Sequence, residues 1–388
     1  MGRIYIFTGK GGVGKSSVAA AHAIKSAEEG KRTLLVSTDM AHNLGDIFEM
    51  HLGKEPEAVL PNLDAYEIDS EYVMSNDYAS IMDYVGSLMS DMGVADAQDL
   101  GMIPGMEELF SLLKIAEIHK SGTYERIMVD CAPTGETLSL LKFPELMSWY
   151  MEKLFPIGKV GIRMLAPISK TVFKVEMPNK SALSEIERLY LKLTELQELL
   201  KDRDITSVRI VTTPEKMVIE ETKRNYMYLN LYNFNVDGLY INRILPENAD
   251  NPFFDEWKRL QKEYVTYLHE CFSALPIHEI SWYDEELKGT ENIRRIVRDV
   301  LQGSDVFETK NLTERETFQM VDEGYELQVF LPGADKSDID LFQSPTDIVI
   351  KTGNFKRNVP LPNVLRKYVV ARAKFEGDAL HVLFTKEE

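Results

Sequence analysis

The residues of this chain best suited to chemistry lie near its start, in the run Gly9-Lys10-Gly11-Gly12-Val13-Gly14-Lys15-Ser16. The run matches the pattern G-x-x-x-x-G-K-[ST], in which backbone N–H groups of the loop converge on phosphate oxygens. Lys15 can reach the terminal phosphates of a nucleotide, and the hydroxyl of Ser16 can ligate Mg²⁺. An apolar run precedes the loop and a helical pattern follows it, so an incidental glycine-rich turn is a much weaker interpretation.

Lys10 is a second lysine in this loop, at a position where the pattern does not require one. It can reach across a dimer interface to the nucleotide of a partner subunit, as an arginine finger does. Taken alone, the residue is explained equally well as a solvated lysine on a loop.

Two aspartates directly follow expected strands: Asp39 comes after residues 33–36 and Asp130 after residues 126–129. The carboxyl ends of parallel strands are where open α/β sheets bind ligands. There Asp39 can orient or deprotonate an attacking water, and Asp130 can hold Mg²⁺ through water. We predict Ser16, Asp39 and Asp130 as the Mg²⁺ site. A helix N-cap or turn role is the alternative for each aspartate.

The elements that must position these residues alternate between strands and helices. Short apolar runs predict buried strands at residues 4–7, 33–36, 126–129, 207–211 and 238–241, and longer patterns predict helices at 17–29, 181–201 and 214–231. This alternation predicts an α/β fold with a doubly wound, mostly parallel sheet. After about residue 303 short alternating runs predict a small all-β sandwich instead.

These patterns give a domain plan. We expect a phosphate-loop, nucleotide-binding domain over residues 1–302, with helical insertions at about 72–120 and 145–200. A linker over residues 303–316 and a β-sandwich over residues 317–388 complete the plan.

Composition excludes several classes of protein. The 388 residues carry 44 Lys and Arg against 62 Asp and Glu, and this net charge of −18 argues against nucleic-acid binding. Two cysteines are too few for a disulfide framework or a four-cysteine zinc site within one chain. No apolar run approaches the roughly 18 residues of a membrane span, and no signal-peptide pattern opens the sequence. We therefore expect a cytoplasmic protein that is not an integral membrane protein.

With Lys10 in place, the loop resembles the deviant phosphate loop of a dimeric class that includes MinD, nitrogenase iron protein and the arsenite-pump and tail-anchored-protein-targeting ATPases. Residues 37–46 and 130–138 resemble the two switch segments of the last group. Residues 213–222 and 241–246 follow its later blocks. The resemblance implies a homodimeric Mg-ATPase that closes over two ATP molecules, in which Asp39 positions water and Lys10 acts in trans.

The same resemblance extends the site to the base of the nucleotide. Leu245 stands where guanine-specific proteins place the aspartate of N-K-x-D, so ATP is favoured, with Asn242 as the adenine contact. We predict as catalytic residues Asp39, Lys10 and Lys15, and as nucleotide-binding residues Gly9, Lys10, Gly11, Gly12, Val13, Gly14, Lys15, Ser16, Ser17, Asn242 and Pro276.

Two absences separate this chain from parts of the resembling family. Residues 246–253 contain no C-x-x-C, the motif with which the eukaryotic targeting ATPases clamp zinc between subunits, so no zinc is expected. The chain also has neither the duplicated halves nor the cysteine metalloid site of the arsenite-pump ATPases. A catalytic subunit of an arsenite-type transporter therefore stays only an alternative.

The methionines point to possible partners. Eleven of the 17 lie between residues 74 and 177, and Met82, Met89 and Met92 are spaced to share one helix face. Flexible thioethers suit surfaces that accept varied hydrophobic partners, and the resemblance implies a groove for transmembrane helices of client proteins, delivered to a membrane receptor. Ordinary core packing, or a holdase that delivers no client to a membrane, remain alternatives. A MinD-like positioning ATPase is disfavoured because the chain ends in β-structure, not an amphipathic helix.

The C-terminal segment from residue 317 resembles the α-crystallin domain of small heat-shock proteins. Short strands at the family's spacing carry this resemblance, which is more diffuse than that of the first 300 residues. The segment lacks the I-x-I tail with which such proteins build large oligomers. Client holding and a role in stability or solubility are equally good interpretations.

Overall fold

The structure is a computed structural model that describes residues 2–39, 43–79, 106–131, 185–249, 251–308, 315–344, 347–353 and 355–386. Its contacts divide the chain into two compact units. The first contains Met1–Glu67, Tyr124–Thr134 and Leu200–Glu388, and the second contains Ile68–Thr123 and Gly135–Leu199. None of the helices described is both long enough and apolar enough to cross a membrane.

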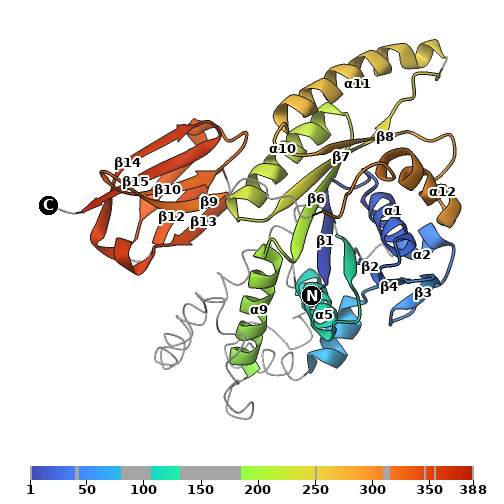
Figure 1. Ribbon diagram of the computed structural model, residues 1–388, viewed down its shortest axis with the longest axis horizontal. Helices are drawn as coiled ribbons and strands as arrows, with labels where there is room; N and C mark the ends of the chain where they lie inside the picture. Colours follow the sequence, from blue (N-terminus) through green and yellow to red (C-terminus); the bar gives the residue numbers. More distant parts are fainter. Residues whose placement is uncertain are drawn as a thin grey trace, which may run out of the picture. The chain divides into compact units, whose positions relative to one another are not determined.

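The first unit is built on one eight-stranded sheet with the order β3-β4-β2-β5-β1-β6-β7-β8 (Figure 1). Its strands are β1 (Arg3–Thr8), β2 (Thr33–Ser37), β3 (Glu57–Leu60), β4 (Leu63–Glu67), β5 (Arg126–Asp130), β6 (Thr206–Thr212), β7 (Val236–Ile244) and β8 (Ile277–Ser281). All neighbours pair in parallel except β3 and β4, which are antiparallel. The predicted α/β fold with a mostly parallel sheet is confirmed.

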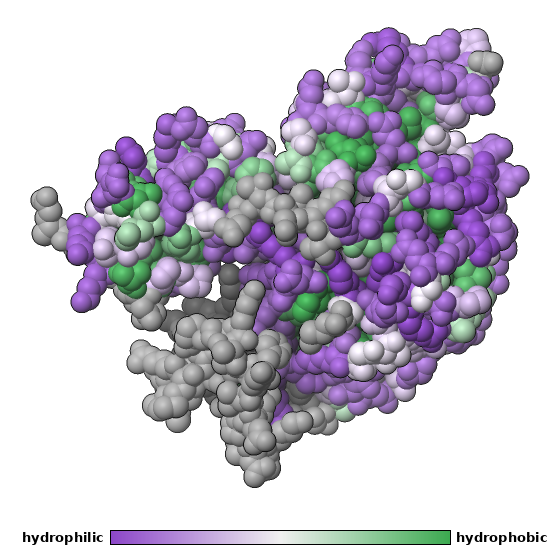
Figure 2. Space-filling view, in the orientation of Figure 1, coloured by the Kyte–Doolittle hydropathy of each residue, from purple (hydrophilic) through white to green (hydrophobic). Residues whose placement is uncertain are grey.

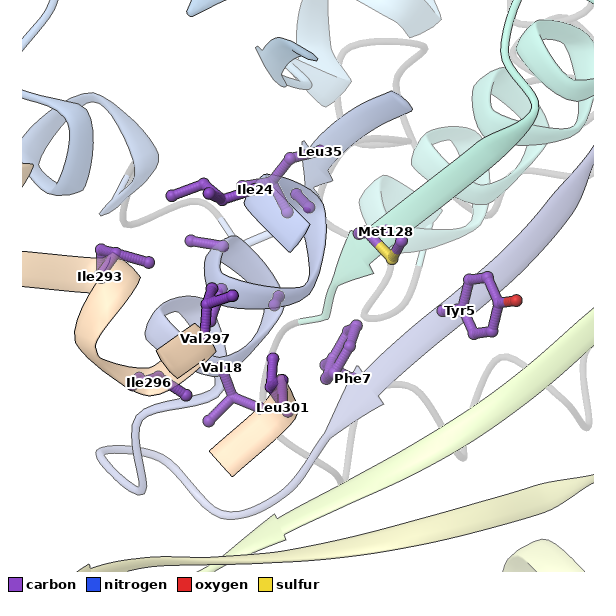
Figure 3. Close-up of a cluster of buried hydrophobic side chains, with 14 of the residues drawn as sticks. Tyr5, Phe7, Val18, Ile24, Leu35, Met128, Ile293, Ile296, Val297 and Leu301 are labelled. Carbon is purple, nitrogen blue, oxygen red and sulfur yellow. The ribbon is translucent and has the colours of Figure 1, made fainter. Parts of the chain in front are cut away.

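A hydrophobic core fills the space between the sheet and helix α1. The helices of the unit are α1 (Lys15–Glu28), α2 (Asn43–Phe48), α10 (Lys216–Leu231), α11 (Pro252–Cys271) and α12 (Gly289–Ile296), and α12 continues into the π-helical turn η6 (Val297–Leu301). Figure 3 shows Val18 of α1 near Ile296, Leu301 and Phe7 of β1, and Ile24 of α1 beside Leu35 of β2. Alanine, the best helix former, recurs along α1 and lets it pack closely on the strands.

Strands β3, β4 and β8 were not predicted, because a search for apolar runs misses strands that carry charge. All five residues of β4 are buried although two are carboxylates. Asp64 pairs with Arg32 and accepts a hydrogen bond from the Tyr124 hydroxyl at 2.8 Å. Glu67 accepts one from the backbone N–H of Gly45 at 2.9 Å. These partners, which lie far away in sequence, make it possible to bury charge in a strand.

Helix α11 leaves much of its apolar side exposed. Phe253 is 70% exposed and Trp257 is 50% exposed, and only Leu268 is buried among the residues of this helix. Figure 2 shows a mostly hydrophilic face on which hydrophobic side chains gather over α10 and α11.

The second unit is described through α3 (Ser70–Tyr72), the π-helical turn η1 (Val73–Asp77), α5 (Met106–Ser121) and most of α9 (Glu185–Lys201). Glu117 of α5 accepts hydrogen bonds from the Tyr78 hydroxyl and from Lys192 of α9, both at 2.8 Å. The predicted methionine face of Met82, Met89 and Met92 lies outside the described residues. Met128, counted with these methionines, is a core residue of β5 in the first unit.

The C-terminal part consists of two antiparallel sheets, which confirms the predicted small all-β domain. One sheet has the order β14-β15-β10-β9 and the other β11-β12-β13. Their strands are β9 (Glu316–Val321), β10 (Gly324–Phe330), β11 (Ile339–Gln343), β12 (Asp347–Thr352), β13 (Phe355–Pro360), β14 (Tyr368–Glu376) and β15 (Ala379–Lys386), with 3₁₀ turns η7 (Lys336–Asp338) and η8 (Asn363–Lys367). Alternate residues of β10 and β12 are buried, such as Leu327, Val329, Ile348 and Ile350.

The apolar residues that alternate along strand β14 predict one buried face, but the structure leaves most of them exposed. Val369, Ala371 and Ala373 are exposed, and the register with β15 shifts between Val370 and Arg372. β14 is an edge strand whose one neighbour is β15, and bulges and exposed side chains are common in such strands.

The segment expected to be a linker begins inside the α/β core. Val306 and Phe307 are buried, and the Tyr5 hydroxyl donates to the carbonyl of Phe307 at 3.2 Å. Arg209 of β6 donates to the carbonyl of Val306. Residues 306–307 are thus packed against the sheet before the chain reaches β9.

Candidate functional site

Three adjacent strands bring the predicted catalytic groups to one edge of the sheet. Because β5 lies between β2 and β1, Asp130 at the end of β5 is in register with both Ser37 and Phe7. Asp39 follows β2 by two residues, and its N–H donates to Oγ of Ser37 at 3.1 Å. The phosphate loop follows β1 at the same edge. Residues 40–42 and 132–138 of the two switch segments lie outside the described residues.

The loop needs glycine where other parts of the chain approach its backbone. Gly9 and Gly14 have φ values of 155° and 93°, conformations that side chains disfavour. A Cβ added to Gly9 would clash with the carbonyl of Val211, and one added to Gly14 would clash with Nδ2 of Asn242. The neighbouring strands β6 and β7 thereby determine which residues of the loop must be glycine.

Helix α1 begins at Lys15, directly behind the loop. Gly14 occupies the N-cap position and offers no side chain to the first N–H groups of the helix. Helix N-termini with free N–H groups attract phosphate. Lys15 is buried, and its Nζ donates to the carbonyl of Lys10 at 3.4 Å, so its ammonium lies over the loop. Ser16, one residue further, is partly buried in the first turn.

Asp130 is a buried carboxylate that is suited to bind a cation. It is 1% exposed, and neither of its carboxylate oxygens has a hydrogen-bond partner. Burial raises its pKa from 3.8 to about 6; the nearby Ser16 hydroxyl and Lys15 ammonium lower it, and Asp39 raises it. A hard cation prefers oxygen ligands, so Ser16 and Asp130 fit Mg²⁺. No group of three or more His, Cys, Asp or Glu side chains suited to a metal occurs in the part of the chain that the structure describes. Magnesium held mainly by phosphate and water needs none.

Asn242 joins the phosphate loop to the end of β7. Its Nδ2 donates to the carbonyl of Val13 at 2.9 Å, and its Oδ1 accepts from the N–H of Arg243 at 2.9 Å. Arg243 has a positive φ of 60°, and its carbonyl accepts a hydrogen bond from Gln261 of α11. An amide nitrogen has two hydrogens, so the bond to Val13 uses one of the two N–H groups of Asn242.

Pro276 is not brought together with the other predicted residues. It directly precedes β8, five residues before the end of that strand at Ser281, and its carbonyl accepts from the N–H of Leu239 at 3.0 Å. Because β7 and β8 are parallel, Pro276 lies toward the opposite edge of the sheet, and its role as a nucleotide contact stays a prediction. Trp282 directly follows β8, its N–H donates to the carbonyl of Ile244 at the end of β7 at 2.7 Å, and its side chain is 55% exposed. Sequence reasoning missed this residue, although an aromatic residue behind a strand was the available signal.

Lys10 is the other residue whose surroundings the sequence did not reveal. Its Nζ donates to Oε2 of Glu221 in α10 at 2.6 Å. The two residues are 211 positions apart, so only the pairing of β1 with β6 brings them together. In this structure the ammonium of Lys10 is therefore held in an ion pair with α10.

Comparison with known proteins agrees with this geometry. The sequence model of the family described as anion-transporting ATPase matches residues 2–302, and that of the HSP20-like domain found in ArsA matches residues 322–384. A putative arsenical pump-driving ATPase of Chlorobaculum tepidum is 35% identical over 393 residues, covering 100% of this chain and 96% of the relative. An ATPase get3 of Pyrenophora tritici-repentis is 32% identical over 305 residues, covering 75% of this chain and 89% of the relative. The phosphate loop and its strands thus belong to a shared domain, and the chain belongs to the anion-transporting ATPase family, as an ATPase that carries the HSP20-like domain of that family.

Proposed function

We propose that this ATPase works as a homodimer that closes over two Mg-ATP molecules and so controls a hydrophobic groove for client proteins, among them proteins with a C-terminal transmembrane helix. The observation that carries the nucleotide chemistry is the orphan carboxylate of Asp130 beside Lys15 and Ser16. Mg²⁺, when bound, would neutralise charge on the β- and γ-phosphates. Support for the client class comes from the similarity to a protein named ATPase get3.

The residues divide the work of hydrolysis between positioning and charge stabilisation. Asp39, at the end of β2, orients the attacking water, and Lys15 stabilises charge on the transferred phosphoryl group. Ser16 and Asp130 hold the metal, partly through water. Lys10 completes the site of the partner subunit, which makes hydrolysis depend on closure of the dimer.

A mixture of two inactive variants tests the role of Lys10. In the proposal, the site of one subunit uses its own Asp39 and Lys10 of the partner. Subunits with Lys10→Ala and subunits with Asp39→Asn are each inactive, but a mixed dimer regains one complete site. Random mixing should therefore restore about a quarter of wild-type turnover. No recovery after verified subunit exchange would show that Lys10 acts within its own subunit, and unchanged turnover in Asp39→Asn would remove Asp39 from the mechanism.

A second candidate function is supported by the printed names of relatives that match the whole chain, which call them putative arsenical pump-driving ATPases. An ATPase subunit of such a pump should be stimulated by the transported anion. We expect turnover to be unchanged by arsenite or antimonite, because the sequence lacks a cysteine cluster that could bind them. Metalloid stimulation that depends on Cys131 or Cys271 would favour the pump instead.

A further inference from the structure

The side chain of Lys10 is held by a helix of its own chain. In the ion pair with Glu221, 43% of the lysine side chain and 30% of the glutamate side chain are exposed. Ion pairs that are this accessible to water contribute little to stability, so a phosphate can compete with Glu221 for the ammonium. The pair therefore holds Lys10 only until a stronger anion comes within its reach.

The place of Glu221 follows from the way in which α10 is fixed to the sheet. The next residue, Thr222, is buried; its hydroxyl donates to the carbonyl of Val218 at 2.8 Å and lies 2.9 Å from the hydroxyl of Thr212 at the end of β6. Because β6 pairs with β1, which leads into the loop, this contact sets Glu221 beside Lys10.

The other end of α10 is held by an arginine from the C-terminal sheets. Arg357 of β13 is 5% exposed, donates to the carbonyl of Leu231 at 2.5 Å and pairs with Glu316. The Tyr232 hydroxyl, just after α10, donates to the carbonyl of Lys356 at 3.2 Å. The last carbonyls of a helix have no partner within it, and the helix dipole favours a cation there. Arg357 meets both requirements.

A second arginine holds the chain that connects α10 to β7. Arg315, which directly precedes β9, donates to Oδ1 of Asn230 at 2.6 Å and to the carbonyls of Phe234 and Val236 at 2.9 and 2.7 Å. Burial lowers its pKa to about 10, so it stays charged at neutral pH. Its three acceptors span the end of α10 and the start of β7, and they fix the helix at this end.

We propose that Glu221 is a positioning residue for Lys10, and that Arg315 and Arg357 set its place by holding the far end of α10. The proposal rests on the proposed role of Lys10 at the phosphates of ATP, but it holds whether Lys10 acts within its subunit or across an interface. Lys10 must leave Glu221 before it can contact a phosphate, so a firmer ion pair lowers the affinity for ATP. By holding α10, the C-terminal sheets keep Glu221 beside Lys10 and thereby lower the affinity for ATP.

The first test compares Glu221→Gln with Glu220→Gln in the full chain, with the Kd of ATP measured by calorimetry in an Asp39→Asn background. Glu220, which pairs with Lys223 at 3.5 Å, is the matched control on the same helix. Glu221→Gln should lower the Kd about twofold to fivefold, the range expected for a partly exposed ion pair. Glu220→Gln should not change it.

Two further readouts separate positioning from a merely structural effect. The gain from Glu221→Gln should shrink as ionic strength rises, because salt screens the ion pair, and it should vanish in a Lys10→Ala background. An unchanged Kd, or a gain that survives Lys10→Ala, overturns the role of Glu221. Failure of the proposed function is seen separately, since turnover would then survive Lys10→Ala.

The second test acts at the far end of α10. Arg357→Gln should lower the Kd of ATP in the same direction as Glu221→Gln, and the double variant should show less than the sum of both changes. Arg357→Lys should restore the wild-type value. Because Arg357→Gln can disrupt the C-terminal sheets, Tyr232→Phe serves as a milder variant that removes one hydroxyl. Wild-type Kd values in both Arg357→Gln and Tyr232→Phe, or full additivity with Glu221→Gln, overturn the role of the sheets.

Discussion

At the scale of single residues, Asp130 shows that the requirements of nucleotide chemistry oppose those of stability. A carboxylate with a pKa of about 6 keeps its proton to a higher pH in the folded protein than in the unfolded chain, where it titrates near 3.8. Folding therefore becomes less favourable as the pH rises from 3.8 to 6, and the full cost above pH 6 is about 3 kcal/mol. In the proposed function, Mg-ATP would supply the cation that removes this cost.

We predict that Asp130→Asn abolishes Mg-dependent turnover but raises the free energy of unfolding without nucleotide. The gain at pH 7.5 should approach about 3 kcal/mol, and it should nearly disappear at pH 4, where the native carboxyl group is protonated. Urea unfolding at the two pH values measures both quantities. As a control, Asp64→Asn should be destabilising at pH 7.5, because Asp64 has partners in Arg32 and Tyr124. A loss of stability in Asp130→Asn would contradict this account.

Gly14 offers a second prediction at this scale. Gly14→Ala combines a positive φ with a clash against Asn242, whereas Gly12→Ala combines a positive φ of 80° with open space. Both variants should lose about 1 kcal/mol from backbone strain, and Gly14→Ala should lose clearly more. Denaturant unfolding of the two variants, without nucleotide, tests this difference. Equal losses of unfolding free energy in the two variants would mean that Asn242 can move away from residue 14 without an energetic cost.

At the scale of elements, local sequence patterns predict apolar strands and the phosphate loop. They do not predict strands or ion pairs that depend on residues distant in the sequence. The phosphate loop, β1, β2 and β5 could be predicted because apolar runs and a fixed spacing specify them. Strand β4 could not, because the partners of its two carboxylates lie elsewhere in the chain: Arg32 and Tyr124 contact Asp64, and the N–H of Gly45 donates to Glu67. The pairing of Lys10 with Glu221 has the same origin: it is created by strand order, and no local pattern contains it.

A buried ion pair between β6 and β7 allows a prediction about the stability of the sheet. Arg209 of β6 is 2% exposed, its Nε donates to Asp237 of β7 at 3.1 Å, and it also holds the carbonyl of Val306. Asp237→Asn would leave a buried guanidinium without its counter-ion, which should cost about 3–5 kcal/mol of unfolding free energy.

A matched control removes an exposed ion pair. Glu263→Gln breaks the contact with Arg259 on α11 at 2.5 Å and should leave the unfolding midpoint unchanged, because water solvates both groups. Equal effects of Asp237→Asn and Glu263→Gln in denaturant unfolding would contradict the importance given to the buried pair.

At the scale of the whole molecule, an ATPase sheet and two C-terminal antiparallel sheets are combined in one chain. The family and the fold could be read from ordered motifs spread over the first 300 residues. The proposed client surface is not located, since most of the methionine-rich segments lie outside the described residues. A direct measurement of client binding therefore bears most on the proposed function.

That measurement is capture of a client by the full chain with Asp39→Asn and ATP, co-expressed with a protein that bears one C-terminal transmembrane helix. Asp39→Asn should bind ATP without hydrolysing it, so a closed, client-bound state persists. We predict capture that requires ATP and that disappears when the helix is replaced by a polar segment of equal length. Absence of capture, while the wild-type ATPase is active and the client is expressed, would contradict a client-binding function.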